Sequence, residues 1–254
     1  MHPDFPIGEY IMHHVTNSSE WKLPFLPAIH FPPWFSLHAM MLVVASIFLV
    51  WLFVFVYDRN TRVPTGITNA LEAFVVFIRD DIAIEFMGEE DGRKFTPLLC
   101  TFFFFILCLN LMGLIPAFAT ATGNINVPGA LALVTFAIIV FGTMLRNGVK
   151  EFFTAFLPRG IFLPLALFIG LMEFFSLFIK MGALMLRLFA NMLAGHIVII
   201  SLLALIVLFG YFALPSLIMA LFIFVLETFV AFLQAYIFTL LSALFIGQMY
   251  HPQH

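Results

Sequence analysis

The stretch IFLPLALFIGLMEFFSLFIKMGALMLRLFANMLAGHIVIISLLALIVLF, residues 161–209, decides the fold. It holds 49 residues and only three formal charges, on Glu173, Lys180 and Arg187. A run of about 20 apolar residues already crosses a bilayer. As one helix the stretch would be roughly 73 Å long, so it either contains a turn or runs steeply tilted. Because tilts beyond about 40° are unusual for ordinary spans, one long helix here would be a specialised feature.

Arg187 is the costliest residue of this stretch. A cation at bilayer depth costs from about 3 to more than 10 kcal/mol, depending on the reference state. Its guanidinium keeps its proton, so it cannot itself carry one. A permanent positive charge does, however, drive a nearby carboxyl group toward its ionised form. We therefore take Arg187 as the first candidate functional residue.

The composition extends the membrane assignment to the whole chain. The 254 residues are 63% apolar and only 10% charged, with 35 phenylalanines, which indicates an all-α integral membrane protein in a lipid bilayer. The net charge of −3 gives no reason to expect a nucleic-acid partner. Cys100 and Cys108 are interpreted as small hydrophobic residues rather than as a disulfide or metal site.

We predict about five membrane-embedded helices, near residues 36–57, 97–118, 129–145, 161–209 and 216–249, the last two long, strongly tilted and paired as a hairpin. Helical spacing of apolar residues over 64–85 predicts one amphipathic helix that lies on the membrane surface or packs on the bundle. A charged turn, 88–94, ends it. Residues 1–35 are expected to form an extramembrane arm and 36–254 a single polytopic membrane domain.

Basic residues predict the orientation of the chain. The loops with Arg59, Arg93 and Arg146 fall on one face by alternation of the spans, and the positive-inside rule places that face in the cytoplasm or its equivalent. The arm then lies on the opposite, periplasmic side. Because its first residues have neither a basic region nor an apolar core, we expect no cleavable signal or transit peptide.

The predicted hairpin brings polar residues level in pairs. In an antiparallel pair that turns near Gly210–Pro215, His196 and Glu227 share the midpoint 211.5, and Arg187 and Gln234 share 210.5. Asn191, four residues after Arg187, lies on the same side of its helix. His196 is nine residues on, about half a rotation away, which would let the two pairs face different surroundings.

Structural alternatives remain open for each of these residues. Arg187 and Glu227 could form a buried ion pair without any transport role, and His196 could be a hydrogen-bonded core residue. Asn191 and Gln234 are of the type that joins helices by hydrogen bonds. Asn110 is interpreted as a packing residue near a helix end. The histidines in or near the arm are taken as solvated, so no metal site is predicted.

Four motifs together resemble one family. Residues 186–196, LRLFANMLAGH, are similar to the signature of subunit a of F-type ATP synthases, the stator of a membrane rotary motor. The similarity extends to NLMGLIP at 110–116 and LQAYIF at 233–238, and EYIMHH at 9–14 resembles bacterial members.

The resemblance implies roles for particular residues. Arg187 would face a ring of c subunits, each of which carries one ion-binding carboxylate, and Asn191 and Gln234 would line the same interface. His196 and Glu227 would belong to the access channel on the non-cytoplasmic side, and Glu173 to the opposite half-channel. The hairpin 161–250 would then form the ion channel against the ring.

The resemblance also implies partners and a location. The chain would be a membrane subunit of an ion-transporting two-sector ATPase that couples ion flow, expected to be of protons with sodium as the alternative, to ATP synthesis. It would have no nucleotide-binding or hydrolytic site, no cofactor and no metal of its own. Expected partners are the c ring, the peripheral-stalk b subunits, the rest of the F1Fo complex and the lipid bilayer. The bacterial plasma membrane is expected, with the mitochondrial inner membrane as the alternative.

Two other functions fit the same residues. A self-contained secondary transporter or proton channel could use Arg187 and Glu227 as a gate, and it would be active in liposomes without any partner. A structural assembly subunit would instead bury the two residues as an ion pair, and it would tolerate Arg187→Gln if Glu227 were changed to Gln with it.

Overall fold

The computed structural model describes residues 20–21, 29–30, 32, 36–57, 65–115, 118, 120–154, 156–157, 162–210 and 214–250. Most of the arm, the loop 58–64 with Arg59, and Pro116 lie outside these residues. By length and composition, five helical stretches could cross a membrane: Leu37–Val56, Gly66–Gly113, Asn126–Arg146, Leu163–Ile206 and Leu214–Tyr250. The prediction of an all-α membrane protein with five apolar helices is therefore confirmed.

The described elements follow the chain in this order: β1 (Glu20–Trp21), β2 (Ile29–His30), α2 (Leu37–Trp51), η1 (Leu52–Val56), α3 (Gly66–Phe77), η2 (Ile78–Ile84), α4 (Glu85–Gly113), η3 (Ala121–Gly123), α5 (Asn126–Ala137), η4 (Ile138–Gly142), α6 (Thr143–Asn147), α7 (Val149–Thr154), α8 (Leu163–Phe209) and α9 (Leu214–Tyr250). Helix α8 runs for 47 residues and α9 for 37. Of the two predicted forms of residues 161–209, the single long helix is the one observed.

The chain divides into two compact units, each of which is described by itself. Unit 1 contains residues 1–51, 104–127 and 187–235, and unit 2 contains residues 52–103, 128–186 and 236–254. Helices α4, α8 and α9 each contribute to both units.

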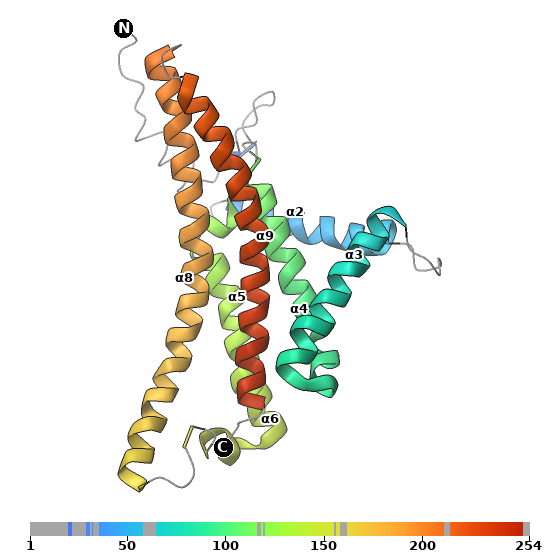
Figure 1. The fold of residues 1–254 in the computed structure, drawn as a ribbon, viewed down its shortest axis with the longest axis vertical. Coiled ribbons are helices and arrows are strands. Elements are labelled where there is room, and N and C mark those ends of the chain that lie inside the picture. The colour runs from blue at the N-terminus through green and yellow to red at the C-terminus, as the bar shows by residue number, and fades with distance from the viewer. Residues whose placement is uncertain are drawn as a thin grey trace. The chain divides into compact units, whose positions relative to one another are not determined.

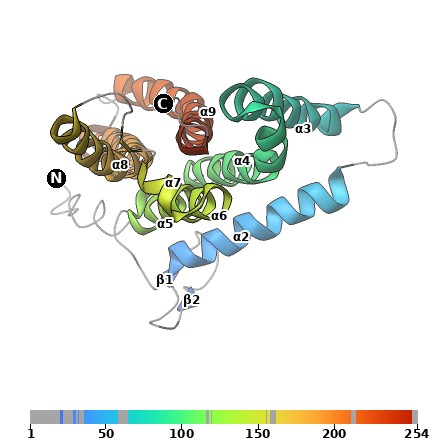
Figure 2. The same ribbon diagram turned by 90° about the horizontal axis from the view of Figure 1, so that it is seen from below.

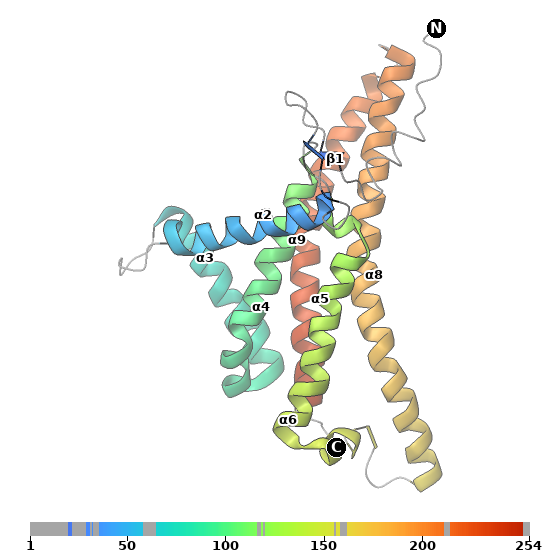
Figure 3. The ribbon, with the colours of Figure 1, turned by 180° about the vertical axis from the view of Figure 1, so that it is seen from behind.

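Unit 1 is built on a small apolar core between α2, the end of α4 and the segment around η3. Met41 and Ala45 of α2 are fully buried against Leu109 and Ala121. The short antiparallel pair of β1 and β2 lies beside the start of α2 (Figures 2 and 3). The end of α8 and the beginning of α9 run side by side in this unit (Figure 1). This core fixes the segment around η3, which matters for the site below.

Unit 2 contains the predicted amphipathic helix, which packs on α4 through its apolar stripe. Ile78 and Ile82 are fully buried, and the rings of Phe74 and Phe103 lie 5.6 Å apart. The chain reverses at Gly88, whose φ of 77° and ψ of 169° belong to a region that is essentially restricted to glycine. The helix thus packs on α4, and its place relative to the membrane surface stays a prediction.

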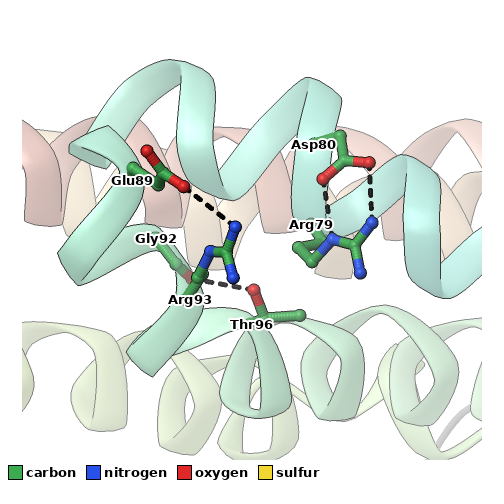
Figure 4. A network of polar contacts seen from close by, with 6 residues as sticks. All are labelled: Arg79, Asp80, Glu89, Gly92, Arg93 and Thr96. Atoms are coloured by element: carbon green, nitrogen blue, oxygen red, sulfur yellow. Dashed lines mark hydrogen bonds and ion pairs between the residues drawn. The ribbon is translucent and has the colours of Figure 1, made fainter.

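The helix predicted to start near Pro97 begins earlier, because α4 is helical from directly after the break at Gly88. Two ion pairs between residues four apart, Arg93 with Glu89 and Lys94 with Glu90, lie on the first turns after Gly88. Such pairs stabilise helices, so the charges that indicated a turn are mostly helical. Figure 4 shows the first of these pairs beside the bond from the Thr96 hydroxyl to the Gly92 carbonyl.

An ion pair within unit 2 joins the charged turn to the end of α6. Arg146, at the end of α6, donates to the Asp91 carboxylate, which is 4% exposed. The Arg146 guanidinium also lies 5.2 Å from the centre of the Tyr250 ring, and Tyr250 packs edge-on against Phe95. Arg93 and Arg146, two of the basic residues from which the orientation of the chain was predicted, are therefore both held in ion pairs.

The backbone of Gly88 provides a test of this fold. No atom lies within 4 Å of a Cβ built on Gly88, so Gly88→Ala would act through backbone strain alone, of order 1–3 kcal/mol. We expect a lower melting temperature of the purified chain in detergent. Gly182→Ala is the matched control, because its Cβ also meets nothing and alanine is favoured inside a helix. Equal melting temperatures for the two variants would contradict the assigned turn.

Candidate functional site

The central pair of the site is His196 on α8 and Glu227 on α9, both in unit 1. The His196 Nδ1 and Glu227 Oε1 atoms lie 3.9 Å apart, with the two side chains 18% and 4% exposed. Gly210, with φ of 56°, ends α8 just before the reversal of the chain. The prediction that His196 and Glu227 come level in an antiparallel hairpin is confirmed.

Gly195 makes room for the carboxylate. A Cβ built on Gly195 would collide with Oε1 and Cδ of Glu227, so the closest approach of α8 to this side chain depends on the missing methyl group. Glu227 is thereby enclosed by the glycine on one side and approached by the neighbouring imidazole on the other. The position of the carboxyl group is set by the backbone of α8 as well as by its own helix.

Thr120 adds a third polar group, from the segment just before η3. Its Oγ1 lies 2.8 Å from His196 Nε2, and the residue is 7% exposed. No sequence pattern pointed to this residue. Its one available signal was a hydroxyl in an uncharged linker, which is too common in membrane proteins to single out a position.

Several buried polar atoms of unit 1 have unused hydrogen-bonding capacity. Asn110 donates through Nδ2 to the Ala231 carbonyl at 3.4 Å, which agrees with its interpretation as a packing residue near a helix end. Among the described residues, the buried atoms without a hydrogen-bond partner in unit 1 are Asn110 Oδ1, Thr122 Oγ1, His196 Nδ1 and both carboxylate oxygens of Glu227. Native proteins leave few such atoms, and in unit 1 three of them belong to the His196–Glu227 pair.

Arg187 lies on the outer surface of this chain and not in the buried cluster. Its residue class is exposed, and within the described residues it makes no hydrogen bond or ion pair. Glu227 pairs with His196 instead, so the alternative of a buried Arg187–Glu227 ion pair is not found in the described structure. A permanent cation on a membrane helix needs a counter-charge, and the described residues of this chain do not supply one.

Asn191 and Gln234 differ in exposure. Asn191 is half-buried on α8, and Gln234 is 9% exposed on α9. In the observed register, residues that lie level on α8 and α9 have numbers that sum to 423, as His196 and Glu227 do. The numbers of Arg187 and Gln234 sum to 421, so Gln234 lies two residues, or about 3 Å, from the level of Arg187. No hydrogen bond joins Gln234 to Arg187 in the described part of the chain, so their predicted pairing stays a prediction.

Glu173 belongs to unit 2 and is half-buried on the first part of α8. In the same unit, Lys180 donates to Gln248 at 3.4 Å and lies 5.5 Å from the centre of the Phe245 ring. The polar residues of α8 are thus distributed over both units. Within the described residues, no three His, Cys, Asp or Glu side chains gather as a metal-binding group would require.

Comparisons with known proteins agree on one family. The sequence matches the family model described as ATP synthase A chain over residues 38–247. An ATP synthase subunit a of Anaeromyxobacter dehalogenans strain 2CP-C is 47% identical over 83% of this chain and 56% of its own length. The protein of the same name from strain 2CP-1 is 43% identical over 96% of this chain and 70% of its own. The chain therefore spans little more than half of the first relative and over two thirds of the second.

A third relative extends the similarity to another group of bacteria. The ATP synthase subunit a 2 of Chlorobium luteolum is 43% identical over 97% of this chain and 76% of its own length. The matched family region, residues 38–247, contains all of the site residues described above, from Asn110 to Gln234.

The register of the hairpin can be tested by disulfide formation. In a chain without Cys100 and Cys108, the pair Gly195→Cys and Glu227→Cys should form a disulfide on mild oxidation, because the Gly195 Cβ position faces Glu227. The control pair is Gly195→Cys and Ala220→Cys, which is displaced by seven residues, about 10 Å, along α9. The readout is the number of thiols that a maleimide mass tag labels in membranes. Faster oxidation of the control pair would contradict the register.

Proposed function

The chain belongs to the ATP synthase A chain family, and on that premise we propose that it is the stator subunit that conducts ions, expected to be protons, through the Fo sector of a rotary ATP synthase. In this proposal it offers two offset half-channels to a ring of c subunits. Its fixed arginine, Arg187, discharges the ring carboxylates one at a time, so that ion flow drives rotation and ATP synthesis.

The observation that carries this proposal is the separation of Arg187 from Glu227. Glu227 is buried beside His196, whereas Arg187 is exposed on the outer surface of α8 without a counter-charge among the described residues. A self-contained gate would bring the two charges together. The separation instead favours a second subunit as the source of the carboxylate that faces Arg187.

The proposed cycle follows from the cost of charge in lipid. An ion enters through the buried polar atoms around Glu227 and His196 and neutralises a ring carboxylate. The neutral site can then turn through the hydrocarbon, which a charged one could not do without a large cost. After nearly a full turn the site reaches the other half-channel, at which the field of Arg187 favours the ionised carboxylate and releases the ion.

Arg187 also separates the two half-channels in this proposal. A fixed cation repels a hydrated proton or sodium ion, so it prevents direct leakage from one side to the other. We place Asn191 and Gln234 beside it at the ring interface, and Glu173 in the half-channel toward the cytoplasm. Run in reverse, ATP hydrolysis would pump ions outward.

The proposal fixes the partners and the place of action. The c ring would contact the Arg187 face, and the b subunits of the peripheral stalk would hold the chain against rotation. The place of action would be the bacterial plasma membrane, with the N-terminal arm on the periplasmic side; the named relatives come from bacteria. Nucleotide binding and hydrolysis would take place in other subunits.

Arg187→Ala tests the stator role in the assembled complex. We expect ATP-driven pumping to be abolished, because nothing then discharges the ring carboxylate or blocks leakage. The measurement is ATP-driven acidification of inverted membrane vesicles. Arg93→Ala is the control, since Arg93 is an exposed partner of Glu89 and its loss should leave pumping intact.

Coupled pumping by an assembled Arg187→Ala complex would overturn the stator proposal. Reconstitution of the chain alone in liposomes separates it from the transporter alternative. The stator conducts no ions without the c ring, whereas a self-contained channel would.

Glu227→Gln tests the proposed inlet. The amide keeps the volume of the side chain but can neither release nor accept a proton as a carboxyl group does. We therefore expect slower passive proton conduction through the Fo sector of vesicles stripped of F1. A rate equal to that of the unchanged protein would remove Glu227 from the ion path.

A further inference from the structure

We propose that Thr120 is a positioning residue for His196, and that its hydroxyl holds the Nε2 side of the imidazole so that Nδ1 exchanges a proton with Glu227. The inference rests on the proposed ion path through His196 and Glu227. It assigns distinct tasks to the two ring nitrogens and brings a residue of the linker between α4 and α5 into that path.

The contacts of the imidazole are asymmetric. Nε2 lies 2.8 Å from the Thr120 Oγ1, well within hydrogen-bonding distance. Nδ1 lies 3.9 Å from the Glu227 Oε1 and has no hydrogen-bond partner. The latter distance is longer than a hydrogen bond, and a small side-chain rotation or one bridging water closes it. One nitrogen is therefore fixed and the other faces the carboxylate.

The methyl group of Thr120 occupies space that two glycines leave open. The Cγ2 atom sits near two glycines, since Cβ atoms built on Gly113 and Gly123 would lie 3.2 and 3.3 Å from it. A β-branched side chain has few χ1 rotamers, and packing of the methyl group fixes the direction of the hydroxyl. The glycines thus leave the space in which the Thr120 methyl group is seated.

The backbone at Thr120 is equally well fixed. The Gly123 N–H donates to the Thr120 carbonyl at 3.0 Å, and the Asn124 N–H donates to the Ala121 carbonyl at 3.1 Å. Ala121, the next residue, is 1% exposed in the core with Met41. A hydroxyl in this position is a rigid anchor for the imidazole.

The proton chemistry explains why such an anchor matters. When His196 is an imidazolium, both nitrogens are donors, and the Nε2–H can donate to Thr120 while the Nδ1–H faces Glu227. Transfer of the Nδ1 proton to the carboxylate gives a neutral imidazole and a neutral carboxylic acid. The Nε2–H bond to Thr120 persists through this step, so the ring neither flips nor changes which nitrogen faces Glu227.

A pair of matched variants isolates the hydroxyl. Thr120→Val keeps the branched shape and removes the hydrogen bond, whereas Thr120→Ser keeps the hydroxyl and removes the methyl group. In vesicles with the assembled complex, stripped of F1, we expect proton conduction to be about threefold to tenfold slower with valine, as for the loss of one buried hydrogen bond. Serine should restore most of the rate.

Thr228→Val is the control for the same chemical change. Thr228 follows Glu227 directly, but its hydroxyl donates to the Phe224 carbonyl of its own helix at 2.9 Å. We expect its conduction rate to stay close to that of the unchanged protein. If this variant slows conduction as much as Thr120→Val does, the specific role of Thr120 is overturned.

A double-mutant cycle shows whether Thr120 acts through His196. In a His196→Ala background, Thr120→Val should cause no further loss, because the group that it positions is gone. Additive losses, an unaffected Thr120→Val complex, or equal losses in the valine and serine variants would each overturn the proposal. Should the valine variant fail to assemble, Thr120→Ala compared with Thr120→Ser gives the same contrast, since both lack the methyl group.

The same experiment separates this inference from the proposed function. Normal conduction in both Glu227→Gln and His196→Ala would contradict the proposed ion path through these two residues. Normal conduction in Thr120→Val, together with slow conduction in those two variants, would contradict only the positioning role of Thr120.

Discussion

The cost of an uncompensated charge in hydrocarbon governs the polar groups of this chain. A helix in lipid can satisfy its own backbone, but it cannot neutralise a guanidinium that never loses its proton. The chain keeps its buried acid, Glu227, next to an imidazole and leaves Arg187 exposed. Because Glu227 and Arg187 do not form an ion pair with each other, each stays available to a different partner. This separation is what a stator subunit of the family would need.

The membrane spans and the hairpin register could be predicted because the first follow from the lengths of apolar runs and the second from the position of the turn. Bilayer thickness sets the minimum run of apolar residues, so the five helices are readable from composition along the chain. In two antiparallel helices joined by a short turn, the residue numbers of level positions add to a constant. His196 and Glu227, which are 31 positions apart, could therefore be paired from their numbers alone. The start of α4 was misjudged because salt-bridged charges at helical spacing continue a helix as readily as they end one.

Thr120 could not be predicted, and the reason is physical. It is separated from His196 by 76 positions, and its place depends on how a short linker packs against α2 and the end of α4. No periodicity describes a linker, and a threonine hydroxyl carries no charge that demands an explanation. Gly195 was read as part of a motif, but its close approach to Glu227 emerges only when the two backbones are placed.

The combination of rigid supports and unused polar atoms is what distinguishes this cluster from an ordinary buried pair. A purely structural Glu–His contact gains most when every oxygen and nitrogen is bonded, because each buried unpartnered atom costs about 1–3 kcal/mol. Here Thr120 lies at hydrogen-bonding distance from His196 Nε2, yet Nδ1 and both carboxylate oxygens have no hydrogen-bond partner. In the proposed ion path these atoms are free to bind and release a proton, which a saturated hydrogen-bond network would resist.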